Sequence, residues 1–102
     1  SPVHETDGAG RVWVYVEAYG LTAGSRFRTV VRLEPEKGEE GAFEIGFEGE
    51  GPADAGEAAR GLYRLELGDS PPGAYEATLR VRDGRTGAES LPARFRVVNR
   101  RR

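Results

Sequence analysis

Aromatic side chains are the residues of this chain best suited to bind a ligand. Trp13, Tyr15 and Tyr19 are separated by even numbers of positions in the segment "RVWVYVEAY". An extended strand therefore places them on one face. Such a row could be an exposed platform that stacks on sugar rings or anchors a protein partner. It could equally be half of a sandwich core or an interdomain seam. Because a buried tryptophan is usual in sandwich folds, we expect Trp13 to be buried and Tyr19, nearer the strand end, to be partly exposed.

Groups that could catalyse a reaction are sparse. The only histidine, His4, lies near the first residue, where chains are commonly frayed, and a Ser-His-Asp arrangement could use no other. Glu44 and Glu48 could form a carboxylate pair, but outward glutamates that alternate along a strand are typical of a solvated face. The absence of cysteine excludes disulfides and thiolate sites. We therefore expect no enzymatic activity and no cofactor.

Two acidic turns and the net charge indicate whether the chain could bind metal ions or nucleic acid. Residues 34–41 and 48–57 supply carboxylates, which Ca²⁺ prefers, but neither turn has the spacing of an EF-hand loop. We predict no metal site and leave calcium binding at these turns open. The net charge of −2 gives no general attraction to nucleic acid. No apolar run approaches the roughly 20 residues that span a bilayer, so we also expect no membrane insertion.

Strands must position these side chains, because alternation of apolar and polar residues runs through most of the chain. Six segments show it, a short seventh strand is possible near residues 2–5, and no stretch has the pattern of an ordinary helix. Glycine-rich and proline-rich turns separate the segments. The sequence therefore predicts an all-β protein, an immunoglobulin-like antiparallel β-sandwich of about seven strands. We expect residues 1–102 to form a single domain.

The stretch "DSPPGAY" predicts a rigid corner before the sixth strand. Pro71 and Pro72 restrict the backbone, and Gly73 supplies flexibility. In immunoglobulin-type sandwiches a tyrosine near the start of this strand donates its hydroxyl to backbone a few residues upstream. We expect Tyr75 to hold the corner in this way, with an ordinary core tyrosine as the alternative.

Two stretches resemble known bacterial modules. The run "PPGAYEATLRVRDGRTG", followed by "FRVV", is similar to the last hairpin of immunoglobulin- or fibronectin type III-like modules, and "VYVEAYGLTAG" resembles a strand in the C-terminal sandwich of GWxTD-motif proteins. The GWxTD motif itself is absent. The resemblance implies a non-catalytic structural or protein-interaction module that contacts a protein partner or other domains of its parent chain. That parent is expected to be a longer, exported or envelope-associated bacterial protein, and the missing initial methionine fits an excised piece. The alternative is a carbohydrate-binding module that holds polysaccharide on its aromatic face.

Edge strands suggest where a partner strand could add. Pro92, Arg94 and Arg96 are typical of a protected edge, whereas residues 42–48 carry a glycine and outward glutamates. If docking uses strand addition, we expect it beside residues 42–48 rather than 91–98, with a basic partner.

Overall fold

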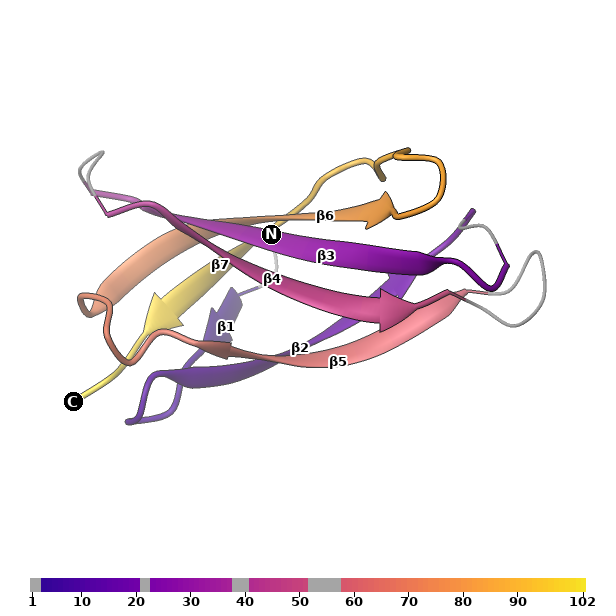
Figure 1. The fold of residues 1–102 in the computed structure, drawn as a ribbon. Helices are drawn as coiled ribbons and strands as arrows, with labels where there is room; N and C mark the ends of the chain where they lie inside the picture. Colours follow the sequence, from indigo (N-terminus) through magenta and orange to yellow (C-terminus); the bar gives the residue numbers. More distant parts are fainter. Residues whose placement is uncertain (1–2, 21–22, 38–40, 52–57) are drawn as a thin grey trace.

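Seven strands and no helix make up the described part of the chain. The computed structural model describes residues 3–20, 23–37, 41–51 and 58–102 (Figure 1). The strands are β1 (Val3–Glu5), β2 (Arg11–Ala18), β3 (Arg26–Pro35), β4 (Phe43–Glu50), β5 (Ala59–Glu66), β6 (Gly73–Asp83) and β7 (Ala93–Asn99). The predicted all-β fold is confirmed, including the short first strand. The acidic turns considered for calcium include residues 38–40 and 52–57, which lie outside the described residues.

The strands form two layers of unequal size. One sheet has five strands in the order β1-β7-β6-β3-β4, and the other contains only β2 and β5 (Figure 1). Pairing of the second strand with the fifth, and of the sixth with the third and seventh, is the arrangement of immunoglobulin-type sandwiches. One detail differs from the predicted antiparallel fold: β1 runs parallel to β7, so the larger sheet is mixed.

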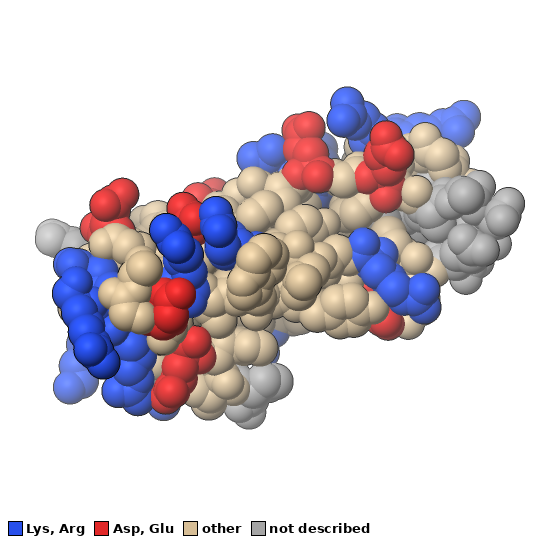
Figure 2. All heavy atoms as spheres, turned by 90° about the horizontal axis from the view of Figure 1, so that it is seen from below, with Lys and Arg blue, Asp and Glu red and all other residues tan. Residues whose placement is uncertain are grey.

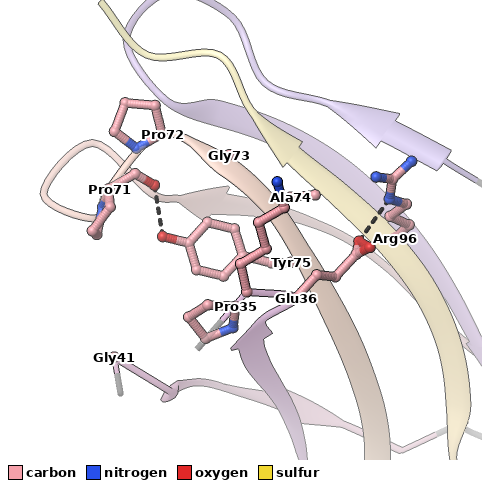
Figure 3. Close-up of a pocket in the computed structure, with 10 residues that line it drawn as sticks. Pro35, Glu36, Gly41, Pro71, Pro72, Gly73, Ala74, Tyr75 and Arg96 are labelled. Atoms are coloured by element: carbon pink, nitrogen blue, oxygen red, sulfur yellow. Dashed lines mark hydrogen bonds and ion pairs between the residues drawn. The ribbon is translucent and has the colours of Figure 1, made fainter. Parts of the chain in front are cut away.

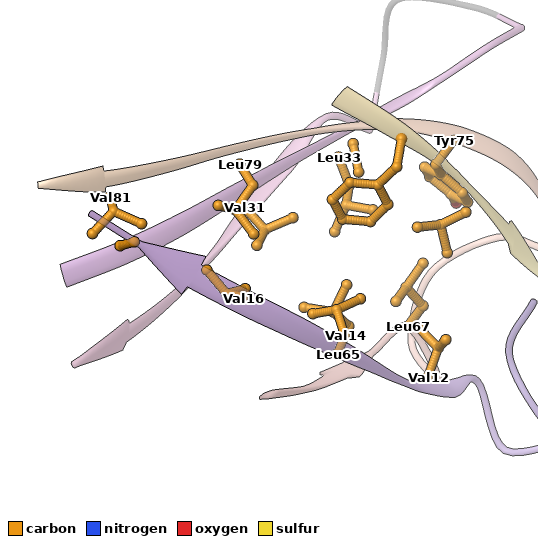
Figure 4. Close-up of a cluster of buried hydrophobic side chains, with 14 of the residues drawn as sticks. Val12, Val14, Val16, Val31, Leu33, Leu65, Leu67, Tyr75, Leu79 and Val81 are labelled. Atoms are coloured by element: carbon orange, nitrogen blue, oxygen red, sulfur yellow. The ribbon is translucent and has the colours of Figure 1, made fainter. Parts of the chain in front are cut away.

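The core lies between the two layers, as the alternation predicts. β2 has a strictly alternating burial pattern, with Val12, Val14 and Val16 inward. These side chains face Val31 and Leu33 of β3 across the interior (Figure 4). Further inward residues come from β5, β6 and β7 and from the residue after β5, and include Leu65, Leu67, Tyr75, Ala77, Leu79, Val81, Phe95 and Val97. Burial of this apolar surface is the main force that holds the small sheet against the large one.

The expectation that Trp13 is buried is wrong. Its side chain is 57% exposed, on the face of β2 that points away from the core. A strand that is apolar on both faces is usually covered on both sides. Here the outer face of β2 has no third layer over it within the described chain, because β2 belongs to the two-stranded outer layer of the sandwich.

The edges of the sheets also differ in part from expectation. β7 lies inside the large sheet, since β1 pairs with residues 96–98 and β6 pairs with its other side. β4 is an edge strand, as expected. Its outward glutamates do not form an isolated acidic stripe, because Glu44 lies opposite Arg32 and Glu48 lies 3.5 Å from Arg28. Strand addition beside residues 42–48 stays a prediction, but its preference for a basic partner loses support.

Candidate functional site

The outer face of the β2–β5 sheet carries the most exposed apolar surface that the strands present. Trp13, Tyr15, Tyr19 and Leu62 are each more than half exposed. The register explains why they meet: Tyr15 lies opposite Leu62, and Trp13 lies opposite Arg64. Figure 2 shows this side of the molecule, with an uncharged area between basic and acidic side chains. We call Trp13, Tyr15, Tyr19 and Leu62 the outer patch.

Charged side chains surround the outer patch, and some of them contact its aromatic rings. The Arg64 guanidinium lies 5.9 Å from the centre of the Trp13 ring, within the range of a cation–π contact, and also pairs with Glu66 at 2.9 Å. A groove runs from Trp13 and Arg64 over the edge of β5 to Ile45 and Phe47 of β4. The patch therefore continues beyond its own sheet into a hollow lined by both apolar and charged side chains.

Glu17 organises the two tyrosines. The Tyr15 hydroxyl donates to one carboxylate oxygen at 2.7 Å, and the Tyr19 hydroxyl donates to the other at 2.6 Å. Arg60, opposite Glu17 in the register, adds a bond of 3.3 Å from its Nε. The hydroxyls of Tyr19 and Tyr15, followed by Arg60, lower the pKa of Glu17 to about 2, and the bonds to Glu17 raise the pKa of both tyrosines. The tyrosine rings are thus restrained before any ligand arrives, which lowers the entropic cost of binding.

This network predicts a specific titration. Because the pKa of Glu17 in the fold lies below its ordinary value of 4.5, the bonds to its carboxylate persist above that value and are lost as the pH falls through about 2. In a Tyr15→Phe/Tyr19→Phe variant, the pKa of Glu17 is expected to rise toward 4.5. Carboxyl ¹³C NMR measures both values. A Tyr63→Phe variant is the matched control and should leave the pKa of Glu17 unchanged, and an unchanged value in the double variant would contradict the network.

The predicted corner is formed at the other end of the sandwich. The Tyr75 hydroxyl donates to the Pro71 carbonyl at 2.6 Å, four residues upstream (Figure 3). Burial raises the pKa of Tyr75 above 10.0, so the hydroxyl keeps its proton at neutral pH. Gly73 has a φ of 131°, a conformation that L side chains rarely adopt, so glycine is required there by the backbone.

Removing the corner hydroxyl is expected to destabilise the domain. Tyr75→Phe should lower the free energy of unfolding by about 1–3 kcal/mol, because the Pro71 carbonyl loses its short bond from Tyr75 and keeps only the longer one from Asn99. Chemical denaturation measures the change. Tyr63→Phe is the control, since the Tyr63 hydroxyl makes no hydrogen bond within the described residues, and its loss should stay below about 0.5 kcal/mol. Equal stability of Tyr75→Phe and the native chain would show that the corner bond contributes nothing.

Asn99, which the sequence reading did not single out, joins three segments at this corner. Its amide nitrogen donates to the carbonyls of Leu67, Ser70 and Pro71 at 2.8, 3.2 and 3.3 Å. Its amide oxygen accepts from the Thr6 hydroxyl at 3.2 Å. Asn99 is only 2% exposed, so the turn after β5 and the end of β1 are tied to the end of β7 by one buried amide.

Sequence reasoning missed one member of the outer patch, Leu62, and two of the charged residues beside it, Arg60 and Arg64. All three come from β5, and the strand register places them opposite Tyr15, Glu17 and Trp13, respectively. A signal was available for Leu62: it is a large apolar residue at an outward position of a segment whose other outward residues are charged.

Other kinds of site find little support in the described residues. They contain no group of three or more His, Asp or Glu side chains placed to hold a metal ion. His4 lies against the Phe95 ring at a centroid distance of 5.2 Å, which is a packing contact. Within the same ranges, no helix is long and apolar enough to cross a membrane.

Comparison with known proteins adds no relative. No protein-family model matches the chain, and neither curated proteins nor solved structures give a significant match.

Proposed function

We propose that this chain is a non-catalytic sandwich module that binds a protein partner, or another domain of a longer chain, through the outer patch. The observation that carries the proposal is the exposure of Trp13, Tyr15 and Leu62 together on one sheet face. Contiguous exposed apolar surface rimmed by polar groups marks interaction sites, and Trp and Tyr are enriched among residues that dominate binding energy.

The surroundings of the patch fit a protein interface better than a catalytic centre. Arg60, Arg64, Glu17 and Glu66 form a rim of both signs around an apolar middle, which is the usual anatomy of an interface. The resemblance to immunoglobulin-like bacterial modules supports the same reading, and with it a setting in an exported or envelope-associated protein. That setting is part of the proposal.

Site-specific photo-cross-linking tests the proposal. A photoreactive phenylalanine analogue at position 15, in the chain expressed in its native host, is expected to yield an adduct with a protein or with another domain. The same analogue at position 91 is the matched control, because Leu91 is 92% exposed and lies outside the patch. Adding Trp13→Ser should reduce the adduct by about tenfold or more, as loss of an interface anchor does. Equal adducts at positions 15 and 91, or no effect of Trp13→Ser, would contradict the proposal.

A carbohydrate-binding module is the second candidate. It is favoured by Trp13 and Tyr15, whose exposed rings lie at alternate positions of one strand and could stack on sugars. Trp13 is the only tryptophan, so its fluorescence reports directly on this face. A saturable change on titration with soluble polysaccharides, abolished by Tyr15→Ala in a variant that keeps its stability, would establish this function in place of the first.

A further inference from the structure

The outer face of the five-stranded sheet carries a cluster of arginines on the layer opposite the outer patch. A groove of about 390 Å³ runs along β3 and β6, and Arg28, Arg32, Arg80 and Arg82 line it. The half-buried Val30 and Thr78 lie between them. We call these four side chains the arginine groove.

The register brings like charges together in this groove. Arg28 lies directly opposite Arg82, and Arg80 lies opposite Val30, so arginines of both strands lie beside one apolar residue. Like charges directly opposite one another destabilise a sheet. Two of the arginines have acidic partners: Arg28 pairs with Glu48 at 3.5 Å and Arg32 pairs with Glu34 at 2.9 Å. Within the described residues, Arg80 and Arg82 form no ion pair.

Gly46 makes room for this arrangement. It lies opposite Val30 on the β4 side, and the Arg28 guanidinium occupies the space where a side chain at position 46 would begin. The Arg28 side chain therefore extends across β4 toward Glu48. Gly46 thus acts as a positioning residue for Arg28.

We propose that the arginine groove binds an extended acidic polypeptide segment whose carboxylates stand at alternate residues. Arg80 and Arg82 are two residues apart on one strand, so their spacing of about 6.8 Å equals that between alternate side chains of an extended ligand. A guanidinium can hold a carboxylate through two parallel hydrogen bonds.

Charges at the margin argue for a peptide over a denser polyanion. Glu44 and Glu89 also line the groove, and the chain as a whole has a net charge of −2. A nucleic acid or heavily sulfated glycan would place further anions against these carboxylates. A peptide with uncharged residues between its acids can avoid them, and Val30 and Thr78 can contact those intervening residues.

Fluorescence anisotropy with a short labelled peptide of alternating Glu and Thr tests the proposal. The peptide is expected to bind the native chain more weakly as salt is added, and a peptide with Gln in place of each Glu should not bind. Arg80→Gln/Arg82→Gln should weaken binding by about tenfold or more. The matched control, Arg100→Gln/Arg102→Gln, removes the same charge near the C-terminal end of the chain and should change binding little.

The outcomes separate this site from the outer patch. Trp13→Ser should leave peptide binding unchanged. The proposal for the arginine groove can therefore be refuted while that for the outer patch stands, and the reverse. Equal binding of the Glu and Gln peptides, or full binding by Arg80→Gln/Arg82→Gln, would overturn the proposal. So would tight binding of heparin or single-stranded DNA by a chain that does not bind the Glu peptide.

Discussion

Replacing Leu65 with alanine is expected to lower the free energy of unfolding by about 2–5 kcal/mol, measured by urea denaturation. Leu65 is fully buried and lies in the two-stranded sheet, where its side chain faces the larger sheet (Figure 4). No hydrogen-bonded strand pair joins the two sheets in the described chain, so packing of such side chains keeps the outer patch in place. The substitution removes buried apolar contacts and leaves a cavity at this junction.

Leu62 provides the matched control in the same strand. Its side chain is 61% exposed on the opposite face, so Leu62→Ala should change the free energy of unfolding by less than about 0.5 kcal/mol. Comparable losses at the two positions would contradict the assignment of inner and outer faces, because both substitutions remove the same atoms.

Replacing Asn99 with alanine is expected to lower the free energy of unfolding by about 2–4 kcal/mol. The variant removes the amide that connects the carbonyls of Leu67 and Pro71 with the Thr6 hydroxyl, and breaking a buried hydrogen-bond network is costly. Thermal and urea unfolding measure the loss. Arg101→Ala is the control, because Arg101 reaches the Ser70 carbonyl of the same turn from a less buried position and its loss should be smaller. A change below 1 kcal/mol for Asn99→Ala would show that the corner does not depend on this amide.

The sequence predicts most of the strands and their inner faces, because a strand has a side-chain period of two. Val12, Val14 and Val16 alternate with larger outward residues, and that alternation alone places them in the core. The hydrogen bond from Tyr75 to the Pro71 carbonyl could also be predicted, because both partners lie within five residues of the chain. Local patterns suffice wherever the interaction is local.

What the sequence could not provide depends on pairing between distant strands. Trp13 was expected to be buried because a buried tryptophan is usual in sandwich folds, and no local feature reveals that β2 belongs to a two-stranded outer layer. The pairing of Glu17 with Arg60, and the opposition of Arg28 and Arg82, follow from registers between strands far apart in the chain. Neither could be read from alternation.

We propose that the outer patch is open in the isolated domain and covered by a partner in the native setting. Because the chain has no cysteine, single cysteines report on this directly. Leu62→Cys and Leu91→Cys should both react rapidly with a maleimide in the purified domain, since both leucines are well exposed. In the native host, we expect the cysteine at position 62 to react several-fold more slowly while that at position 91 keeps its rate. Equal rates at position 62 in the two settings would contradict the claim.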